Sequence, residues 1–142
     1  MGLKSIFVDT NYFCGLYNSA DTLHLKSKEI FEKFKKTQHK LYTSSFIVAE
    51  VLTVLSQRIG KKSSIDFGTD ILSQENLIKI LRINTKIERD AFVIFKKIKS
   101  KNFSFVDALS LALIKKHKIN LLLTFDKQLV NLAKTNNIKI LS

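Results

Sequence analysis

Four acidic residues stand among mainly apolar neighbours in the sequence, namely Asp9, Glu50, Asp107 and Asp126. A carboxylate in apolar surroundings is costly unless a cation or a metal ion meets it. Carboxylates gathered at one place repel one another and raise each other's pKa unless a divalent cation neutralises them. An all-oxygen site selects a hard ion, Mg²⁺ or Mn²⁺, and such an ion can activate a water molecule. The chemistry open to this set is therefore metal-assisted hydrolysis.

Each acid also has a simpler interpretation. Asp9 and Asp126 precede segments with helical patterns and could cap those helices. Ser104 and Asp107 have the spacing of a capping box. Glu50 lies too far beyond Ser44 and Ser45 to belong to a capping box, but it could be an ordinary solvated side chain. Taken singly, none of the four acids decides between these roles.

The segments that carry the acids alternate between β-forming and helical patterns. Strands are predicted at 5–8, 40–43, 77–83, 120–124 and 138–141, and helices at 10–19, 22–37, 44–59, 64–72, 84–99, 105–116 and 127–135. In the helix at 22–37, Leu25, Ile30, Phe31 and Phe34 are expected on the inner side. The helix at 84–99 should bury Ile87, Ala91, Ile94, Phe95 and Ile98, and the helix at 105–116, apolar nearly all round, should be central.

This alternation predicts one α/β domain over residues 1–142. The expected architecture is a three-layer α/β/α sandwich with a mainly parallel sheet, ordered 3-2-1-4-5, and the strand at 77–83 lies at an edge. In that order strands 1 and 4 are neighbours at the topological switch point, where ligands bind in such sheets. Asp9 and Asp126 would end these two strands, while Glu50 and Asp107 would lie in early turns of helices that leave the same edge. The fold is thus expected to bring all four acids together.

The chain is strongly basic, with 24 lysine and arginine residues against 12 acids and a net charge of +12. Such an excess favours a polyanionic partner such as RNA, although a lysine-rich composition alone could also produce it. The residues predicted to contact RNA form two groups, Lys33, Lys35 and Lys36, and Lys96, Lys97, Lys99 and Lys101. An acidic cluster in a basic protein is the pattern expected of a metal-dependent nuclease.

Other sequence features limit the remaining classes. The single cysteine excludes an internal disulfide, and without paired cysteines or histidine-rich spacing a zinc site has no obvious ligands. No signal peptide and no apolar run of membrane-spanning length is evident, so a cytoplasmic protein with no membrane partner is expected.

Four short segments resemble the motifs of PIN-domain ribonucleases, and in particular of the small toxins of VapBC toxin–antitoxin systems. The segments are 7–11, 42–50, 104–109 and 124–126, and the resemblance spans roughly the whole chain. It implies an α/β/α sandwich and an Mg²⁺- or Mn²⁺-dependent endoribonuclease whose cut leaves a 5′-phosphate and a 3′-hydroxyl. Asp9, Glu50, Asp107 and Asp126 would be its catalytic, metal-binding acids.

The same resemblance suggests further residues and partners. The side chains expected to support the acids or to contact phosphate are Thr10, Asn11, Ser104 and Thr124. A protein antitoxin and a homodimer are expected as well. Two alternatives stay open from the sequence: a non-catalytic RNA- or partner-binding protein of the same fold, and an RNA-processing nuclease without an antitoxin.

Overall fold

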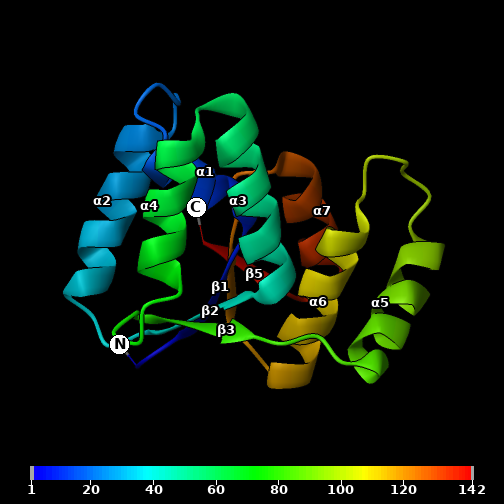
Figure 1. Cartoon of the computed structure of the whole chain (residues 1–142). Coiled ribbons are helices and arrows are strands. Elements are labelled where there is room, and N and C mark those ends of the chain that lie inside the picture. The colour runs from blue at the N-terminus through cyan, green and yellow to red at the C-terminus, as the bar shows by residue number, and fades with distance from the viewer. Residues whose placement is uncertain (1, 142) are drawn as a thin grey trace.

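A computed structural model describes residues 2–141, in which five parallel strands form one sheet of order β3-β2-β1-β4-β5 (Figure 1). The strands are β1 (Ser5–Val8), β2 (Lys40–Ser44), β3 (Ile78–Leu81), β4 (Leu121–Leu123) and β5 (Lys139–Leu141). Phe7, in the central strand, pairs with Tyr42 of β2 on one side and with Leu122 of β4 on the other. The predicted order is confirmed, β3 is an edge strand as expected, and every strand pair is parallel.

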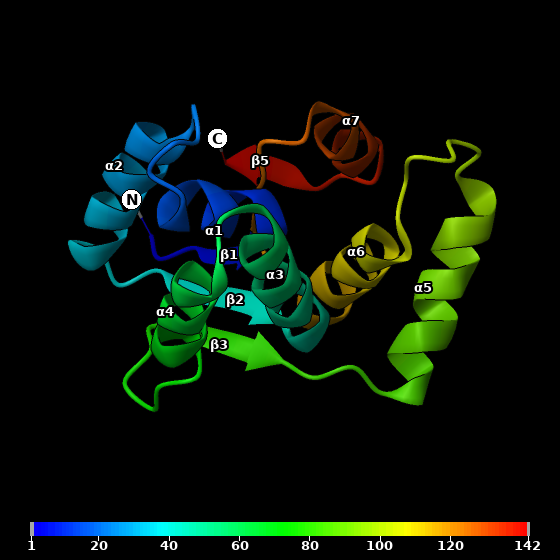
Figure 2. The ribbon, with the colours of Figure 1, turned by 45° about the horizontal axis from the view of Figure 1, so that its top comes forward.

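Two groups of helices cover the sheet. The helices are α1 (Thr10–Tyr17), α2 (His24–Lys35), α3 (Ser45–Arg58), α4 (Lys61–Ile71), α5 (Thr85–Lys97), α6 (Phe105–His117) and α7 (Lys127–Thr135). The connections from β1 to β3 advance in one direction and those from β3 to β5 in the other. Because such crossovers are right-handed, α1 to α4 lie on one face and α5 to α7 on the opposite face. Figures 1 and 2 show these two groups, with α5 at the periphery beside α6.

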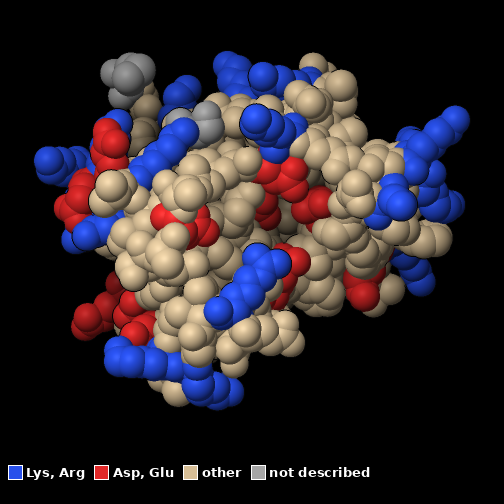
Figure 3. Space-filling model, turned by 90° about the horizontal axis from the view of Figure 1, so that it is seen from above, with Lys and Arg blue, Asp and Glu red and all other residues tan. Residues whose placement is uncertain are grey.

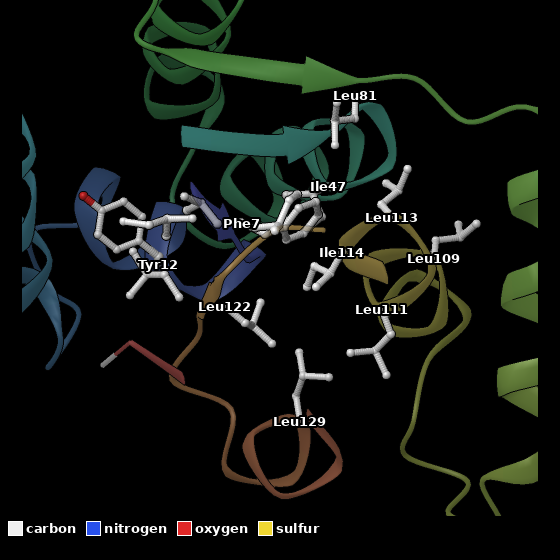
Figure 4. Close-up of a cluster of buried hydrophobic side chains, with 14 of the residues drawn as sticks. Phe7, Tyr12, Ile47, Leu81, Leu109, Leu111, Leu113, Ile114, Leu122 and Leu129 are labelled. Atoms are coloured by element: carbon white, nitrogen blue, oxygen red, sulfur yellow. The ribbon is translucent and has the colours of Figure 1, made fainter. Parts of the chain in front are cut away.

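The core is built by strands that are apolar on both faces. Ile6, Phe7 and Val8 of β1 are buried, as are Leu122 and Leu123 of β4, which is typical of a parallel sheet covered by helices on both sides. All residues of α6 from 108 to 114 are buried, so the prediction of a central α6 is confirmed. Figure 4 shows side chains of α6 and α7 meeting those of the strands in one continuous cluster.

The inner face of α2 was predicted in part wrongly. Leu25 is 79% exposed, and Ser27 and Phe34 are the residues that α2 buries. Ser27 and Phe34 are two turns apart and share one face of the helix, whereas Leu25, two residues before Ser27, points to the other side. Ile30 and Phe31 are half-buried, in line with their predicted inward placement.

Two helix boundaries on the outer parts of the fold also differ from the prediction. Helix α4 begins at Lys61, three residues earlier than predicted, directly after Gly60, whose φ of +146° suits glycine. Helix α5 ends at Lys97, and Phe95 is 38% exposed, although its ring packs against Phe103 and Phe105. Among residues 2–141, no helix is long and apolar enough to cross a membrane.

Candidate active site

The four predicted acids lie at the edge where the parallel strands end. Asp9 follows β1 directly, and Asp126 follows β4 after a short loop; Glu50 and Asp107 lie in the early turns of α3 and α6. The charges of Asp107 and Glu50 act on Asp9, and those of Asp126 and Glu50 act on Asp107. Figure 3 shows acidic side chains around a hollow in the middle of one face, with lysine or arginine side chains at its margin and others further out. The fold therefore brings the four acids into mutual electrostatic contact.

Asp9 is the most deeply buried of the four acids, with 6% of its surface exposed. Its backbone N–H donates to the carbonyl of Leu123 (3.0 Å), and its Oδ2 accepts a hydrogen bond from the Thr124 hydroxyl (2.7 Å). The pKa of Asp9 is raised to about 7, mainly because burial disfavours the charged form; hydrogen bonds from Thr124 and the Thr10 backbone lower the pKa, and the charges of Asp107 and Glu50 add to the rise. Near neutral pH this carboxyl is therefore close to half protonated in the metal-free protein.

Glu50 is half-buried and receives a hydrogen bond from a neighbouring helix. Its Oε2 accepts from the hydroxyl of Thr10, at the start of α1 (2.5 Å). Ser44 caps α3 by accepting the Ile47 N–H (3.1 Å), so the cap and the acid are separate features of this helix. Among residues 2–141, Glu50 has no lysine, arginine or histidine nitrogen within 4.0 Å. The hydrogen bond to Thr10 is thus what holds this carboxylate toward Asp9.

Asp107 has the capping role that its spacing from Ser104 suggested, and it takes part in the acidic cluster as well. The Ser104 N–H donates to Asp107 Oδ2 (3.0 Å), and the Asp107 N–H donates to Ser104 Oγ (3.0 Å). Partial burial raises the pKa of Asp107, and the charges of Asp126 and Glu50 add to this effect. Its second oxygen, Oδ1, has no hydrogen bond among residues 2–141. The cap therefore orients the carboxylate and leaves one oxygen available.

Asp126 is the exposed member of the group and caps α7. Its Oδ1 accepts from the backbone N–H groups of Gln128 (2.9 Å) and Leu129 (3.3 Å). Its Oδ2 accepts no hydrogen bond within the described part of the chain. As with Asp107, the capping role and a place in the acidic cluster are compatible.

A hydrogen-bond network ties the ends of β1 and β4 together beneath the acids. The buried hydroxyl of Thr124 donates to Asp9 and accepts from the side-chain N–H of Asn11 (3.3 Å) and from the backbone N–H of Asp126 (3.1 Å). One donated and two accepted bonds use the full capacity of a hydroxyl. Asn11 Oδ1 also accepts the Phe125 N–H (3.0 Å). Asn11 and Thr124, like Thr10 and Ser104, thus contact the acids or their loops, while a phosphate contact stays a prediction.

The donor set suits a hard divalent ion in its chemistry, since all four side chains offer carboxylate oxygens. Within residues 2–141, no three acidic, histidine or cysteine side chains converge closely enough to hold one ion. Local hydrogen bonds engage one oxygen each of Asp107, Asp126 and Glu50, and mutual repulsion favours separation in the absence of a cation. Binding of one ion by several of these acids would therefore require their side chains to reorient.

The two lysine groups lie at different edges of the sheet. Helix α2 ends just before β2 begins, which places Lys33, Lys35 and Lys36 at the edge away from the acids. Lys33 pairs with Glu29 (3.6 Å) and Lys35 with Glu32 (3.3 Å). The other group spans the last turn of α5, which holds Lys96 and Lys97, and the loop before the cap of α6, which holds Lys99 and Lys101, at the acidic edge. Among residues 2–141 its lysines form no ion pair.

One contact beside the acids was not foreseen from the sequence. The ammonium group of Lys26, on α2, lies 5.4 Å from the ring centroid of Phe125, which stands between Thr124 and Asp126. The position of Phe125 next to Asp126 was the available signal. The partner from α2 could not be inferred, because it depends on how α1 and α2 pack.

Comparisons with known proteins agree with this fold and site. The family model described as PIN domain matches residues 6–135. The 23S rRNA-specific endonuclease VapC20 of Mycobacterium tuberculosis is 26% identical over 121 residues, which are 85% of this chain and 88% of that protein. A VapC ribonuclease of Archaeoglobus fulgidus is 27% identical over 117 residues, 81% of this chain and 73% of that protein.

Solved structures share the architecture at lower identity. The crystal structure of M. tuberculosis VapC20, described as a sarcin–ricin loop cleaving toxin, superposes with a TM-score of 0.80, with 24% identity over 89% of this chain and 94% of that chain. FitAcB from Neisseria gonorrhoeae gives a TM-score of 0.69, with 17% identity over 96% of both chains. These structures confirm the fold, and the family model covers nearly the whole described chain. The protein therefore belongs to the PIN-domain family.

Proposed function

We propose that this protein is an endoribonuclease of the VapC type that hydrolyses RNA phosphodiester bonds with Mg²⁺ or Mn²⁺. The family and the named relatives, an endonuclease and a ribonuclease, confirm the nuclease class expected from the sequence. The observation that carries the proposal for the site is the meeting of Asp9, Glu50, Asp107 and Asp126, from four separate parts of the chain, at one edge of the sheet. The sequence has further acids, but these four act on one another.

The four carboxylates would hold the divalent ion, which, when bound, lowers the pKa of water and offsets charge in the transition state. Thr124 donates to Asp9 and favours its ionised form, which is the form that binds a cation. Thr10 holds Glu50, and Ser104 holds Asp107, each through one carboxylate oxygen. Asp126 is the most exposed of the four acids, and its Oδ2 has no partner within residues 2–141. We therefore propose that Asp126 acts as the general base that accepts a proton from the attacking water.

The proposed biological role is that of the toxin in a toxin–antitoxin pair. Several proteins of similar fold were solved with partners, including a toxin–antitoxin complex from Klebsiella pneumoniae (TM-score 0.60) and VapBC2 from Rickettsia felis bound to a promoter DNA fragment (TM-score 0.63). A small reading frame beside the gene for this chain would supply the antitoxin; its absence would favour an RNA-processing nuclease. The homodimer stays a prediction, which sedimentation of the purified protein tests.

The decisive experiment measures cleavage of a structured RNA by the purified chain. Activity is expected with Mg²⁺ or Mn²⁺, is lost in EDTA, and returns when the ion is restored. Mn²⁺ should also raise the thermal stability of the wild type and much less that of Asp9→Asn, because an ion that binds the native state stabilises it. Undiminished cleavage in EDTA would overturn the metal mechanism. A protein that binds RNA without cleaving it under any of these conditions would be the non-catalytic alternative.

A further inference from the structure

Phe125 occupies a special position at the rim of the acidic cluster. Its two neighbours in the sequence are Thr124, which donates to Asp9, and Asp126. Its backbone N–H donates a hydrogen bond to Asn11 Oδ1. The centroid of its ring lies 6.4 Å from that of Tyr12, a buried residue of α1. The ring is nonetheless only half-buried. It is therefore an aromatic surface anchored by Asn11 and Tyr12 between two residues of the site.

Lys26 extends from α2 over this ring. The distance of 5.4 Å from its Nζ to the ring centroid is within the range of a cation–π interaction. Four ion pairs occur among residues 2–141, and Lys26 belongs to none of them. Its backbone is fixed too, because the hydroxyl of Tyr12 donates to the carbonyl of Ser27 (3.3 Å). A lysine ammonium is thus held over the ring of the residue that directly precedes Asp126 in the sequence, and within residues 2–141 it has no carboxylate partner.

The contrast with other lysines on α2 supports a specific role. Lys33 pairs with Glu29, and Lys35 pairs with Glu32. The Nζ of Lys35 also lies 4.8 Å from the ring centroid of Phe31, so of these three lysines only Lys26 has an aromatic contact without an ion pair. An ammonium on an aromatic face keeps its charge and its N–H donors for an incoming anion, whereas a paired ammonium must first be separated from its carboxylate. The anion that reaches this position in an RNA-cleaving site is a phosphate of the substrate backbone.

We propose that Lys26 binds an RNA phosphate next to the one that is cleaved, and that Phe125 positions it. This inference rests on the proposed ribonuclease function and adds a substrate-binding residue to it. A positive group is needed here, because the acids repel the substrate backbone wherever no cation offsets them. Lys26 stands on the side of the sheet that α1 and α2 cover, opposite the lysines at the end of α5. Lys26 and the lysines at the end of α5 would then bind RNA phosphates on opposite sides of the scissile bond.

The test compares Lys26→Gln with Lys28→Gln. Lys28 lies on the same helix, is exposed, and has no cation–π or ion-pair partner among residues 2–141, so this control removes the same charge. Affinity for a short fluorescein-labelled single-stranded RNA is measured by anisotropy in EDTA, where nothing is cleaved. We expect Lys26→Gln to weaken binding about 5- to 10-fold at low salt, and to reduce the slope of log affinity against log salt by roughly 0.7, as for one lost phosphate contact. Lys28→Gln should change both quantities little.

Steady-state kinetics with Mg²⁺ and the variant Phe125→Leu complete the test. Lys26→Gln should raise KM much more than it lowers kcat. Phe125→Leu should weaken RNA binding in the wild-type background but not in the Lys26→Gln background, because the ring acts through the lysine. Equal effects of the two lysine variants, or a change of melting temperature without a change of affinity, would overturn the proposal. Failure of the nuclease itself would appear differently, as a wild type that binds RNA with the Lys26 dependence but does not cut it.

Discussion

The Thr124 hydroxyl donates a 2.7 Å hydrogen bond to the carboxylate of Asp9 and accepts the backbone N–H of Asp126, so that one side chain joins two of the four acids. Thr124 belongs to the loop after β4 and Asp9 to the end of β1. The relative position of these acids is therefore set by a single buried hydroxyl in addition to the strand pairing.

Replacing this hydroxyl should weaken the site without unfolding the protein. Thr124→Val keeps the volume but removes the donor that lowers the pKa of Asp9, so the proton should leave Asp9 at higher pH. Cleavage with Mg²⁺ at neutral pH is expected to fall roughly 10- to 100-fold, and its rise with pH should shift upward. Thr124→Ser restores the donor and should restore most of the activity. Equal activity of the valine and serine variants would show that the hydroxyl is unimportant.

The raised pKa of Asp9 predicts how the stability of the metal-free protein depends on pH. The folded state binds the proton with a pKa of about 7 and the unfolded chain with a pKa near 3.8. Stability should therefore be highest below the unfolded value and fall as pH rises from about 4 to 7, by up to about 4 kcal/mol. Urea unfolding in EDTA measures this, and Asp9→Asn should flatten the curve in that window. A wild-type curve parallel to that of the asparagine variant would contradict the assignment.

Asp9 and Asp107 should act as one unit in catalysis. They belong to different elements and are linked by charge, so each needs the other chiefly through a shared ion. Asp9→Asn and Asp107→Asn are each expected to reduce RNA cleavage by roughly 10³-fold or more, and the double variant should be little worse than either. Ser104→Ala is the control for the cap: it should lower stability by about 1 kcal/mol while retaining more activity than Asp107→Asn. Multiplicative losses in the double variant would indicate independent roles.

Glu50→Gln separates a site role from a structural one. An amide keeps an acceptor for the Thr10 hydroxyl but removes the negative charge that acts on Asp9 and Asp107. Cleavage should be abolished, while the free energy of unfolding without metal should stay the same or rise by up to about 1 kcal/mol, because repulsion is relieved. Denaturant titration in EDTA checks this. A marked loss of stability would instead mean that the charge of Glu50 supports the fold.

The two lysine groups should differ in their effect on RNA affinity. Charge reversal of Lys96, Lys97 and Lys99, near the cap of α6, should weaken RNA binding and lower its salt dependence. The same reversal of Lys33, Lys35 and Lys36, at the far edge of the sheet, removes an equal charge and is the matched control, with a smaller loss expected. Equal losses would mean that net charge, rather than position, attracts RNA.

The sequence predicted the structure best where a single local pattern, such as an apolar strand or an apolar helix, is enough to fix the position of an element. Strands apolar on both faces predicted the parallel sheet, and the all-apolar pattern of α6 predicted its central place. The acids could be located because each stands at a junction between elements. Whether Asp107 and Asp126 serve as caps or as part of a cluster could not be decided beforehand, since the structure gives them both positions.

Details that depend on packing between helices could not be predicted from the sequence. Leu25 fits a helical stripe by spacing, but the stripe that α2 buries passes through Ser27, a small residue that lets α1 approach closely. A Cβ added at Gly15 would lie 2.6 Å from Ser27 Oγ. Neither the choice of this stripe nor the placement of Lys26 over Phe125 follows from local sequence patterns.

The pairing of β4 with β1, whose paired residues lie 115 positions earlier in the sequence, also bears on when the site can form during synthesis. A nascent chain contains Asp9, Glu50 and Asp107 well before Thr124 and Asp126 are translated, and contacts so distant in sequence form late in folding. Until β4 docks, Asp9 lacks its hydroxyl donor and the fourth acid is missing. A ribosome and its messenger are the RNAs nearest to an unfinished chain. The order of the acids along the sequence thus delays any cleavage until Thr124 and Asp126 have been synthesised and β4 has paired with β1.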